Sequence, residues 1–263
     1  MLHRMELNQA TVIVTGAGSG IGRAIALELA AHGAHVVAVG RRAARIEQTV
    51  QQITEAGGIG LAVPTDVTDS DAVQRLMDTT IERFGRIDVL MNNAGSFQTI
   101  GAVWEVDPDA WWRDVTINLR GSMLSCHHAI PRMIAQGGGI VINMRGGDRI
   151  PGGTGYACSK AAVQRFSELL ARELEMKDTN VLCFSMGPGF VHTEMTDPQI
   201  TTAAGQFWLP GSEQAIKTGR ARAPEDCARA TAQLIQQADP VINGQAFGPD
   251  SDFTQAIAEA KQQ

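Results

Sequence analysis

The chain has 263 residues, of which 44% are hydrophobic and 19% are charged, and its formal net charge is −6. This composition is that of an ordinary globular protein and excludes a chain that is disordered throughout. No run of basic residues is present, so neither a nucleic acid nor a membrane surface is an expected partner. The longest apolar stretches are well short of the roughly 18 residues that a membrane-spanning helix requires.

The four cysteines are scattered and show no C-x-x-C pair or other metal-ligand spacing: Cys126, Cys158, Cys183 and Cys227. We therefore expect no disulfide framework and no metal site. No apolar signal region with a cleavage site precedes the first expected strand, so we expect a cytoplasmic protein. Tyr156 is the single tyrosine of the chain.

Short β-branched runs alternate with helical segments along the chain. The expected strands cover residues 11–15, 35–39, 59–63, 87–91, 140–144, 181–185 and 244–247. The first expected helix begins at residue 21 and ends at Gly33, and another begins at Thr68-x-x-Asp71, which resembles a capping box. The other expected helices cover residues 43–55, 109–135 and 155–176. Strands that alternate with helices pair in parallel through right-handed crossovers. The pattern predicts an α/β fold, a doubly wound parallel sheet of about seven strands with helices on both faces.

A glycine-rich turn joins the first expected strand to the first helix. It reads Thr15-Gly16-Ala17-Gly18-Ser19-Gly20-Ile21-Gly22, a T-G-x-x-x-G-x-G pattern. Glycines let backbone N–H groups approach a pyrophosphate, and the start of the helix favours its negative charge. A plain glycine-rich connection is the alternative. The place of the turn favours a dinucleotide site, with Gly16, Ser19, Gly20, Ile21 and Gly22 as cofactor-binding residues.

Four further motifs follow the turn in order: Asn92-Asn93-Ala94-Gly95, Asn118, Tyr156-x-x-x-Lys160 and Pro188-Gly189-Phe190-Val191-His192-Thr193. Together the motifs resemble the short-chain dehydrogenase/reductase family, over nearly the whole chain. The resemblance implies a single Rossmann-type dinucleotide-binding catalytic domain over residues 1–263, a nicotinamide cofactor and a small alcohol or carbonyl substrate. It also implies a homodimer or homotetramer.

The end of the second strand indicates which nicotinamide cofactor is bound. In Rossmann folds an acidic residue about 20 residues past the turn binds the ribose hydroxyl of NAD. Here Gly40 takes that position and is followed by Arg41 and Arg42. A guanidinium can hold a 2′-phosphate through two hydrogen bonds. We therefore expect NADP, bound by Arg41 with help from Arg42; NAD is the alternative if both arginines are merely solvated.

By resemblance, further cofactor contacts fall at three places. Asp66 would bind the adenine amino group and Val67 the adenine ring, although Asp66 could instead only help to start the next helix. Asn93, Ala94 and Gly95 would line the ribose side. The 188–193 segment would hold the nicotinamide carboxamide, through Pro188, Gly189, Val191 and Thr193.

Tyr156 and Lys160 are four residues apart on an expected helix, so their side chains project from one face. The pKa of a free tyrosine is about 10, and a nearby ammonium group lowers it by favouring the phenolate. We expect Tyr156 to exchange a proton with the substrate, while Lys160 also binds the ribose. An ordinary surface pair is the alternative. By resemblance, Asn118 would fix a helix kink and hold a water that relays protons to Lys160.

The serine that this family usually places before the tyrosine is missing. Aligning Asn143 with the strand-end asparagine puts Gly146 in the serine position, and no serine occurs between Cys126 and Cys158. The loss of one oxyanion donor typically costs about 10²–10³ in rate. Thr154 is the expected substitute; Arg145, Asp148 and Asn143 are the other polar groups nearby. Alternatively, the substrate supplies its own stabilisation, or the protein has become a poor enzyme.

Residues 194–222 follow the nicotinamide motif, where the family places its substrate lid. Phe207, Trp208 and Leu209 offer an apolar cover, and residues 96–100 would form another wall. These residues favour a hydrophobic or cyclic substrate, although they could simply pack onto the core. We expect an NADP(H)-dependent dehydrogenase or ketoreductase acting on a secondary alcohol or ketone. A nucleotide-binding regulatory or scaffold protein with weak redox activity is the alternative.

Overall fold

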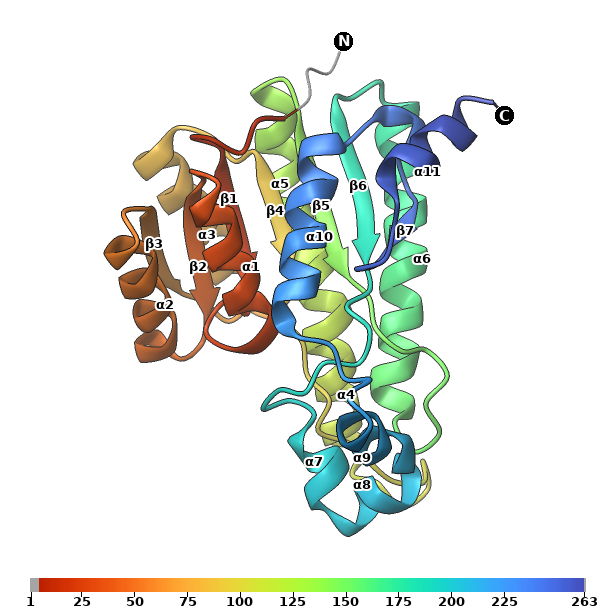
Figure 1. Cartoon of the computed structure of the whole chain (residues 1–263). Helices are drawn as coiled ribbons and strands as arrows, with labels where there is room; N and C mark the ends of the chain where they lie inside the picture. Colours follow the sequence, from red (N-terminus) through yellow and green to blue (C-terminus); the bar gives the residue numbers. More distant parts are fainter. Residues whose placement is uncertain (1–4, 263) are drawn as a thin grey trace.

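Within residues 5–262, which the structure describes, the strands form one sheet in the order β3-β2-β1-β4-β5-β6-β7 (Figure 1). Every neighbouring pair is parallel. In this computed structural model the strands are β1 (Thr11–Thr15), β2 (His35–Gly40), β3 (Ile59–Pro64), β4 (Val89–Asn92), β5 (Gly139–Met144), β6 (Val181–Met186) and β7 (Ala246–Phe247). The predicted doubly wound Rossmann-type fold is confirmed; residues 1–4 and 263 of the expected domain lie outside the described residues.

The helices cover both faces of the sheet. They are α1 (Gly20–Ala31), α2 (Ala43–Glu55), α3 (Ser70–Phe84), α4 (Pro108–Val115), α5 (Gly121–Ala135), α6 (Thr154–Met176), α7 (Asp197–Thr201), α8 (Ala203–Trp208), α9 (Pro210–Lys217), α10 (Pro224–Gln237) and α11 (Phe253–Ala260). Successive strand residues point to opposite faces. Val12 and Val14 therefore pack in a core with α1 and α10, whereas Ile13 packs in a second core with α3, α5 and α6.

The order of the strands places a crevice at one edge of the sheet. The chain builds outward from β1 to β3 and then crosses back, so that β4 pairs with the other side of β1. Crossover connections leave the sheet in opposite directions at such a reversal, and a crevice opens outside the carboxyl ends of the strands. In Figure 1 the carboxyl ends point down, toward α4 and α7–α9.

Three local expectations are wrong in detail. Asp69, not Thr68, caps α3, because its carboxylate accepts hydrogen bonds from the backbone N–H groups of Asp71 and Ala72 at 2.9 and 3.2 Å. Strand β4 begins at Val89 rather than at 87, because the backbone N–H of Ile87 donates to Gln136 instead of to a strand. The long helix over 109–135 is interrupted by a π-helical segment, Thr116–Arg120.

No helix among residues 5–262 is long and apolar enough to cross a membrane.

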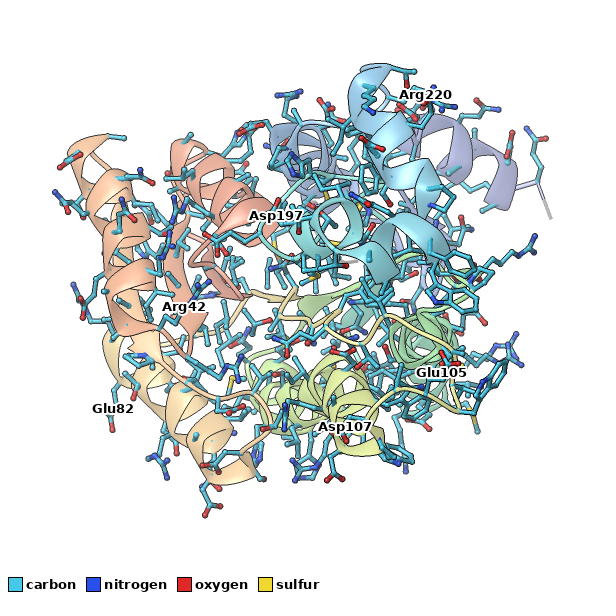
Figure 2. The ribbon with its side chains drawn as sticks, turned by 90° about the horizontal axis from the view of Figure 1, so that it is seen from below. Arg42, Glu82, Glu105, Asp107, Asp197 and Arg220 are labelled. Atoms are coloured by element: carbon cyan, nitrogen blue, oxygen red, sulfur yellow. The ribbon has the colours of Figure 1, made fainter. Side chains whose placement is uncertain are left out.

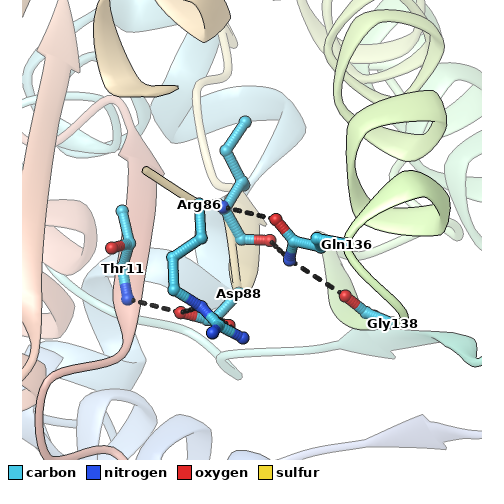
Figure 3. A network of polar contacts seen from close by, with 6 residues as sticks. Thr11, Arg86, Asp88, Gln136 and Gly138 are labelled. Atoms are coloured by element: carbon cyan, nitrogen blue, oxygen red, sulfur yellow. Dashed lines mark hydrogen bonds and ion pairs between the residues drawn. The ribbon is translucent and has the colours of Figure 1, made fainter. Parts of the chain in front are cut away.

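A buried carboxylate holds the strands together at the end opposite the crevice (Figure 3). Asp88 is only 4% exposed, and it accepts hydrogen bonds from the backbone N–H of Thr11 at 2.8 Å and from Nε of Arg86 at 2.7 Å. Beside it, the Gln136 amide donates to the backbone carbonyls of Ile87 and Gly138. These contacts fix the starts of β1, β4 and β5 relative to one another.

We predict that Asp88→Ala lowers the free energy of unfolding by about 1.5–3 kcal/mol, because it leaves the buried N–H of Thr11 without a partner. Arg86→Met is the matched control. The Arg86 side chain is 56% exposed, so removal of its ion pair should cost less than about 1 kcal/mol. Urea unfolding of both variants checks this. Equal losses would assign the effect to the ion pair instead of the buried hydrogen bond.

Candidate active site

A cavity of about 1600 Å³ opens at the carboxyl ends of the strands. Its wall contains the glycine turn after β1, the residues that follow β2 to β6, and residues of the 194–222 segment. Ligand pockets usually measure roughly 300–1,000 Å³, so this cavity has room for a dinucleotide and a second molecule. Figure 2 shows the molecule from this end, with Arg42 beside α2 and Asp197 in α7.

The glycine turn is shaped for close backbone approach. Gly16 has φ of +70°, and a Cβ there would lie 2.8 Å from the Asn93 side-chain nitrogen. A Cβ on Gly22 would lie 2.3 Å from the Gly16 carbonyl oxygen. Ser19 precedes α1 in an extended conformation and makes no side-chain capping bond. The first N–H groups of α1 are thus not capped by Ser19, and the turn fits a pyrophosphate.

Thr15 and Asn93 clamp this turn to the end of β4. The Thr15 hydroxyl accepts hydrogen bonds from the backbone N–H groups of Asn93 and Ala94, both at 3.0 Å. The Asn93 side chain donates to the Thr15 carbonyl at 2.9 Å. The clamp brings Gly16 and Gly95 to the same cavity. The sequence did not single out Thr15, although a polar residue at the end of a buried strand was the available signal.

The end of the cavity beyond β2 and β3 carries the expected cofactor-selecting residues. Arg42 and Arg45 both pair with Glu194, at 3.3 and 3.2 Å. Arg41 is exposed, lines the cavity and forms no ion pair within the described part of the chain. The structure therefore leaves Arg41 available to a ligand anion, whereas Arg42 already holds a carboxylate.

Asp66 and Val67 both line this end of the cavity. The Asp66 carboxylate accepts hydrogen bonds from the backbone N–H and the hydroxyl of Thr68, at 2.9 and 2.8 Å. Burial acts to raise the pKa of Asp66, but these two bonds and the charge of Arg41 outweigh it and lower the pKa below its ordinary value. Asp66 is thus a fixed anion on the cavity wall, and it does not cap α3.

Tyr156 and Lys160 lie on one face of α6, as predicted. The Lys160 Nζ atom is 5.8 Å from the centre of the Tyr156 ring and donates a hydrogen bond to the Met144 carbonyl at 2.8 Å. The Tyr156 ring stacks on Phe97, with 4.3 Å between ring centres. Burial raises the pKa of Tyr156 to about 12 and lowers that of Lys160 to about 8. The phenol of the protein alone therefore keeps its proton at neutral pH.

Asn118 lies inside the π-helical segment, where a kink was expected. Its side chain is fully buried, accepts a hydrogen bond from the backbone N–H of Ser96 at 2.7 Å, and donates to the Ser159 hydroxyl at 2.8 Å. A Cβ on Gly95 would lie 3.1 Å from the Asn118 side-chain oxygen and 3.6 Å from Lys160 Nζ. Asn118 thus joins the loop after β4 to α6 beside Lys160. Its expected role in a proton relay stays a prediction.

At the position of the missing serine, the space is filled by tyrosine. A Cβ on Gly146 would lie 2.2 Å from the Tyr156 hydroxyl oxygen and 3.1 Å from Lys160 Cγ. Thr154, the expected substitute, accepts a hydrogen bond from Trp111 Nε1 at 2.9 Å and does not line the cavity. The expectation that Thr154 replaces the serine is therefore wrong.

The three other candidates can also be sorted by position. Asn143 is fully buried, and its side chain is held by Asn92 and Ser167, both at 2.9 Å. It cannot reach a ligand. Arg145 and Asp148 both line the cavity.

The 188–193 segment faces the glycine turn across the cavity. Pro188, Gly189, Val191 and Thr193 all line it, and a Cβ on Gly20 would lie 3.0 Å from the Thr193 methyl carbon. The following segment folds into α7–α9. Trp208 and Leu209 line the cavity, as expected of a cover, but Phe207 is 74% exposed and does not.

Of the expected wall over residues 96–100, only residues 96–98 line the cavity, and their loop depends on a residue that the sequence did not reveal. Asp114 is fully buried, and its carboxylate accepts hydrogen bonds from the Ser96 hydroxyl and from the backbone N–H groups of Gln98 and Thr99. These bonds hold the loop that places Phe97 against the Tyr156 ring. An aspartate within an expected amphipathic helix carries no signal of this role.

We predict that Gly146→Ala destabilises the protein by about 1–3 kcal/mol and lowers any turnover, because the added methyl group displaces the Tyr156 hydroxyl. Gly147→Ala is the matched control, since its Cβ would meet only the flexible end of Ile150. Thermal unfolding and steady-state kinetics of both variants check this. Unchanged stability and turnover in Gly146→Ala would show that Tyr156 is free to move.

Comparison with known proteins agrees with the geometry of the site. The sequence pattern of the short chain dehydrogenase family matches residues 10–204. A short chain dehydrogenase of Pseudocercospora fijiensis is 33% identical over 98% of this chain and 85% of its own length.

Two solved structures with cofactor are similar throughout. A Burkholderia phymatum short-chain dehydrogenase/reductase in complex with NAD has a TM-score of 0.82 at 25% identity, over 97% of this chain and 93% of that one. A single-residue variant of the actinorhodin polyketide ketoreductase with NADPH has a TM-score of 0.81 at 27% identity, over 91% and 95%. With its matching family pattern, its parallel sheet, its glycine turn, and Tyr156 lining the cavity beside the buried Lys160, this chain belongs to the short-chain dehydrogenase/reductase family.

Proposed function

We propose that this protein is an NADP(H)-dependent oxidoreductase that transfers a hydride between nicotinamide and a secondary alcohol or ketone. The observation that carries the proposal is the meeting of three elements on one cavity. The glycine turn fits the phosphates, residues 188–193 face it, and Tyr156 lies beside Lys160 at the end of β5. A nicotinamide cofactor is supported by the family, and similar proteins bind NAD or NADPH.

A bound nicotinamide donates or accepts the hydride, and the residues of this chain handle the proton. A phenol with a pKa of about 12 retains its proton at neutral pH and can donate it to a carbonyl oxygen during reduction. Lys160 is buried with its ammonium group on the Met144 carbonyl, so it is held close to the Tyr156 ring. For alcohol oxidation the Tyr156 pKa must fall, which requires further positive charge near the phenol.

The preference for NADP is supported by the state of the two arginines after β2. Arg41 lines the cavity without an ion pair in the described chain, and no acidic residue takes the position of Gly40. Arg42 reaches the same region but is held by Glu194. NAD remains the less favoured alternative.

The substrate is proposed to be hydrophobic or cyclic, because Phe97, Trp208 and Leu209 line the cavity. In this proposal the chain acts as one catalytic domain, with 194–222 as its lid, in a cytoplasmic homodimer or homotetramer. The four cysteines are free, which accords with a reducing compartment.

The first test measures oxidation of NADPH with a panel of hydrophobic and cyclic ketones. We predict turnover by the natural protein and a loss of about 10²–10⁴ in Tyr156→Phe, the contribution typical of general acid–base catalysis. NADPH affinity should stay within a few-fold. Tight NADPH binding with no turnover on any ketone would favour the nucleotide-binding scaffold instead.

Ultraviolet difference titration adds a second readout of the same residue, since no other tyrosine contributes. The phenol of the protein alone should titrate near its raised pKa of about 12. In the complex with oxidised cofactor, its pKa should fall below the reference value of about 10. A value at or above the reference in the complex would remove Tyr156 as the base for oxidation.

We predict that Arg41→Asp weakens NADPH binding by about 10- to 100-fold and improves NADH binding, because it replaces a charge-assisted donor with a repelling carboxylate. Arg42→Asp makes the same change of charge at the residue held by Glu194, and its effect should be several-fold smaller. Equilibrium binding of both cofactors checks this. Equal NADPH affinity in Arg41→Asp and the natural protein would contradict the NADP assignment.

A further inference from the structure

Arg145 occupies a central place in the cavity that the proposed chemistry does not use. It directly follows β5, between Met144, whose carbonyl accepts the Lys160 hydrogen bond, and Gly146, which lies against the Tyr156 hydroxyl. Its own backbone N–H donates to the Met186 carbonyl at 2.9 Å. The Arg145 backbone is therefore fixed within the tyrosine–lysine site.

The side chain of Arg145 extends toward the neighbouring strand end and lines the cavity. A Cβ on Gly187 would lie 3.0 Å from both Cζ and Nε of the guanidinium group. The guanidinium thus lies on Gly187, immediately before the Pro188–Thr193 segment. The absence of a side chain at position 187 leaves the room that the guanidinium occupies.

The charge of Arg145 is not compensated by the protein. Its Nε atom is buried without a hydrogen-bond partner, and across residues 5–262 the guanidinium forms no ion pair. Three other arginines of the cavity wall are paired: Arg42 and Arg45 with Glu194, and Arg222 with Asp250. A partly buried cation without a partner is unfavourable unless a ligand supplies the anion.

The surroundings indicate which anion this would be. The phosphate-binding turn lies at Gly16–Gly22, with Thr193 against Gly20, and Arg41 lies beyond β2. Arg145 instead directly precedes Gly146, which lies against the Tyr156 hydroxyl, and Phe97 and Trp208 line the same cavity. A planar guanidinium binds a carboxylate through two parallel hydrogen bonds. An apolar ligand that carries a carboxylate matches both features.

We propose that Arg145 binds a carboxylate group of the substrate, so that the substrate is a hydrophobic oxo acid or hydroxy acid. This inference rests on the proposed function for the reaction, but the anion site itself can be tested by binding alone. Arg145 then serves as a substrate-binding residue directly before Gly146, the position at which the family serine is missing. The charge sets specificity, while Tyr156 handles the proton.

The test is calorimetric binding of cyclohexanecarboxylate and of the uncharged cyclohexanecarboxamide to the protein saturated with oxidised cofactor. The acid should bind about 10- to 100-fold more tightly than the amide, the range expected for charge-assisted hydrogen bonds. Arg145→Met should abolish this preference, and Arg145→Lys should retain part of it. Arg149→Met is the matched control, since Arg149 is an exposed arginine of the same cavity wall, and it should keep the preference.

Cofactor affinity and thermal unfolding of each variant separate the possible failures. The inference requires that Arg145→Met binds the cofactor within about three-fold of the natural protein. Equal affinity for acid and amide, or no binding of the acid, would overturn it. A loss of cofactor affinity in Arg145→Met as large as its loss of acid affinity would also overturn it, by assigning Arg145 to the cofactor phosphates. A carboxylate preference that Arg145→Met removes, in a protein without ketone turnover, would support the anion site and remove the proposed reaction.

Discussion

The hydrogen bonds between Thr15 and Asn93 join the two strands at which the chain reverses its path across the sheet. Because β1 and β4 are parallel, their carboxyl ends meet at one edge of the sheet. The Thr15 hydroxyl and the Asn93 amide tie the glycine turn to the 92–95 segment. The glycine-turn end of the cavity and the position of Gly95 beside Lys160 both depend on this join.

Burial determines the resting state of Tyr156 and Lys160. Tyr156 is enclosed by Phe97 on one side and Gly146 on another, so its neutral form is favoured. Lys160 is buried too, and burial lowers its pKa to about 8. The pair therefore differs from a simple ammonium–phenolate couple, and its protonation depends on what else enters the cavity.

Charge in the cavity is distributed so that some cations are held by the protein and others are left for ligands. Glu194, at the start of the lid segment, holds Arg42 and Arg45, and Asp250 holds Arg222. Arg41, Arg145 and Arg149 line the same cavity without ion pairs in the described chain. The ion pairs distinguish the arginines that brace the cavity wall from those left unpaired, although all six belong to one residue type.

Local patterns in the sequence determined the strands, most of the helices, the glycine turn and the spacing of Tyr156 and Lys160, because each depends on neighbours within one turn or one strand. The cap of α3 was misassigned because Thr68 and Asp69 are both good capping residues, and the contact of Thr68 with Asp66 decided between them. Thr154 was misassigned for a different reason. Its hydroxyl is near Tyr156 along the chain, but it accepts a hydrogen bond from Trp111, which lies 43 residues away. The filled space at Gly146, the pairing of Arg42 with Glu194 and the unpaired guanidinium of Arg145 were decided only by the tertiary structure, because each depends on side chains brought together from separate strands and helices.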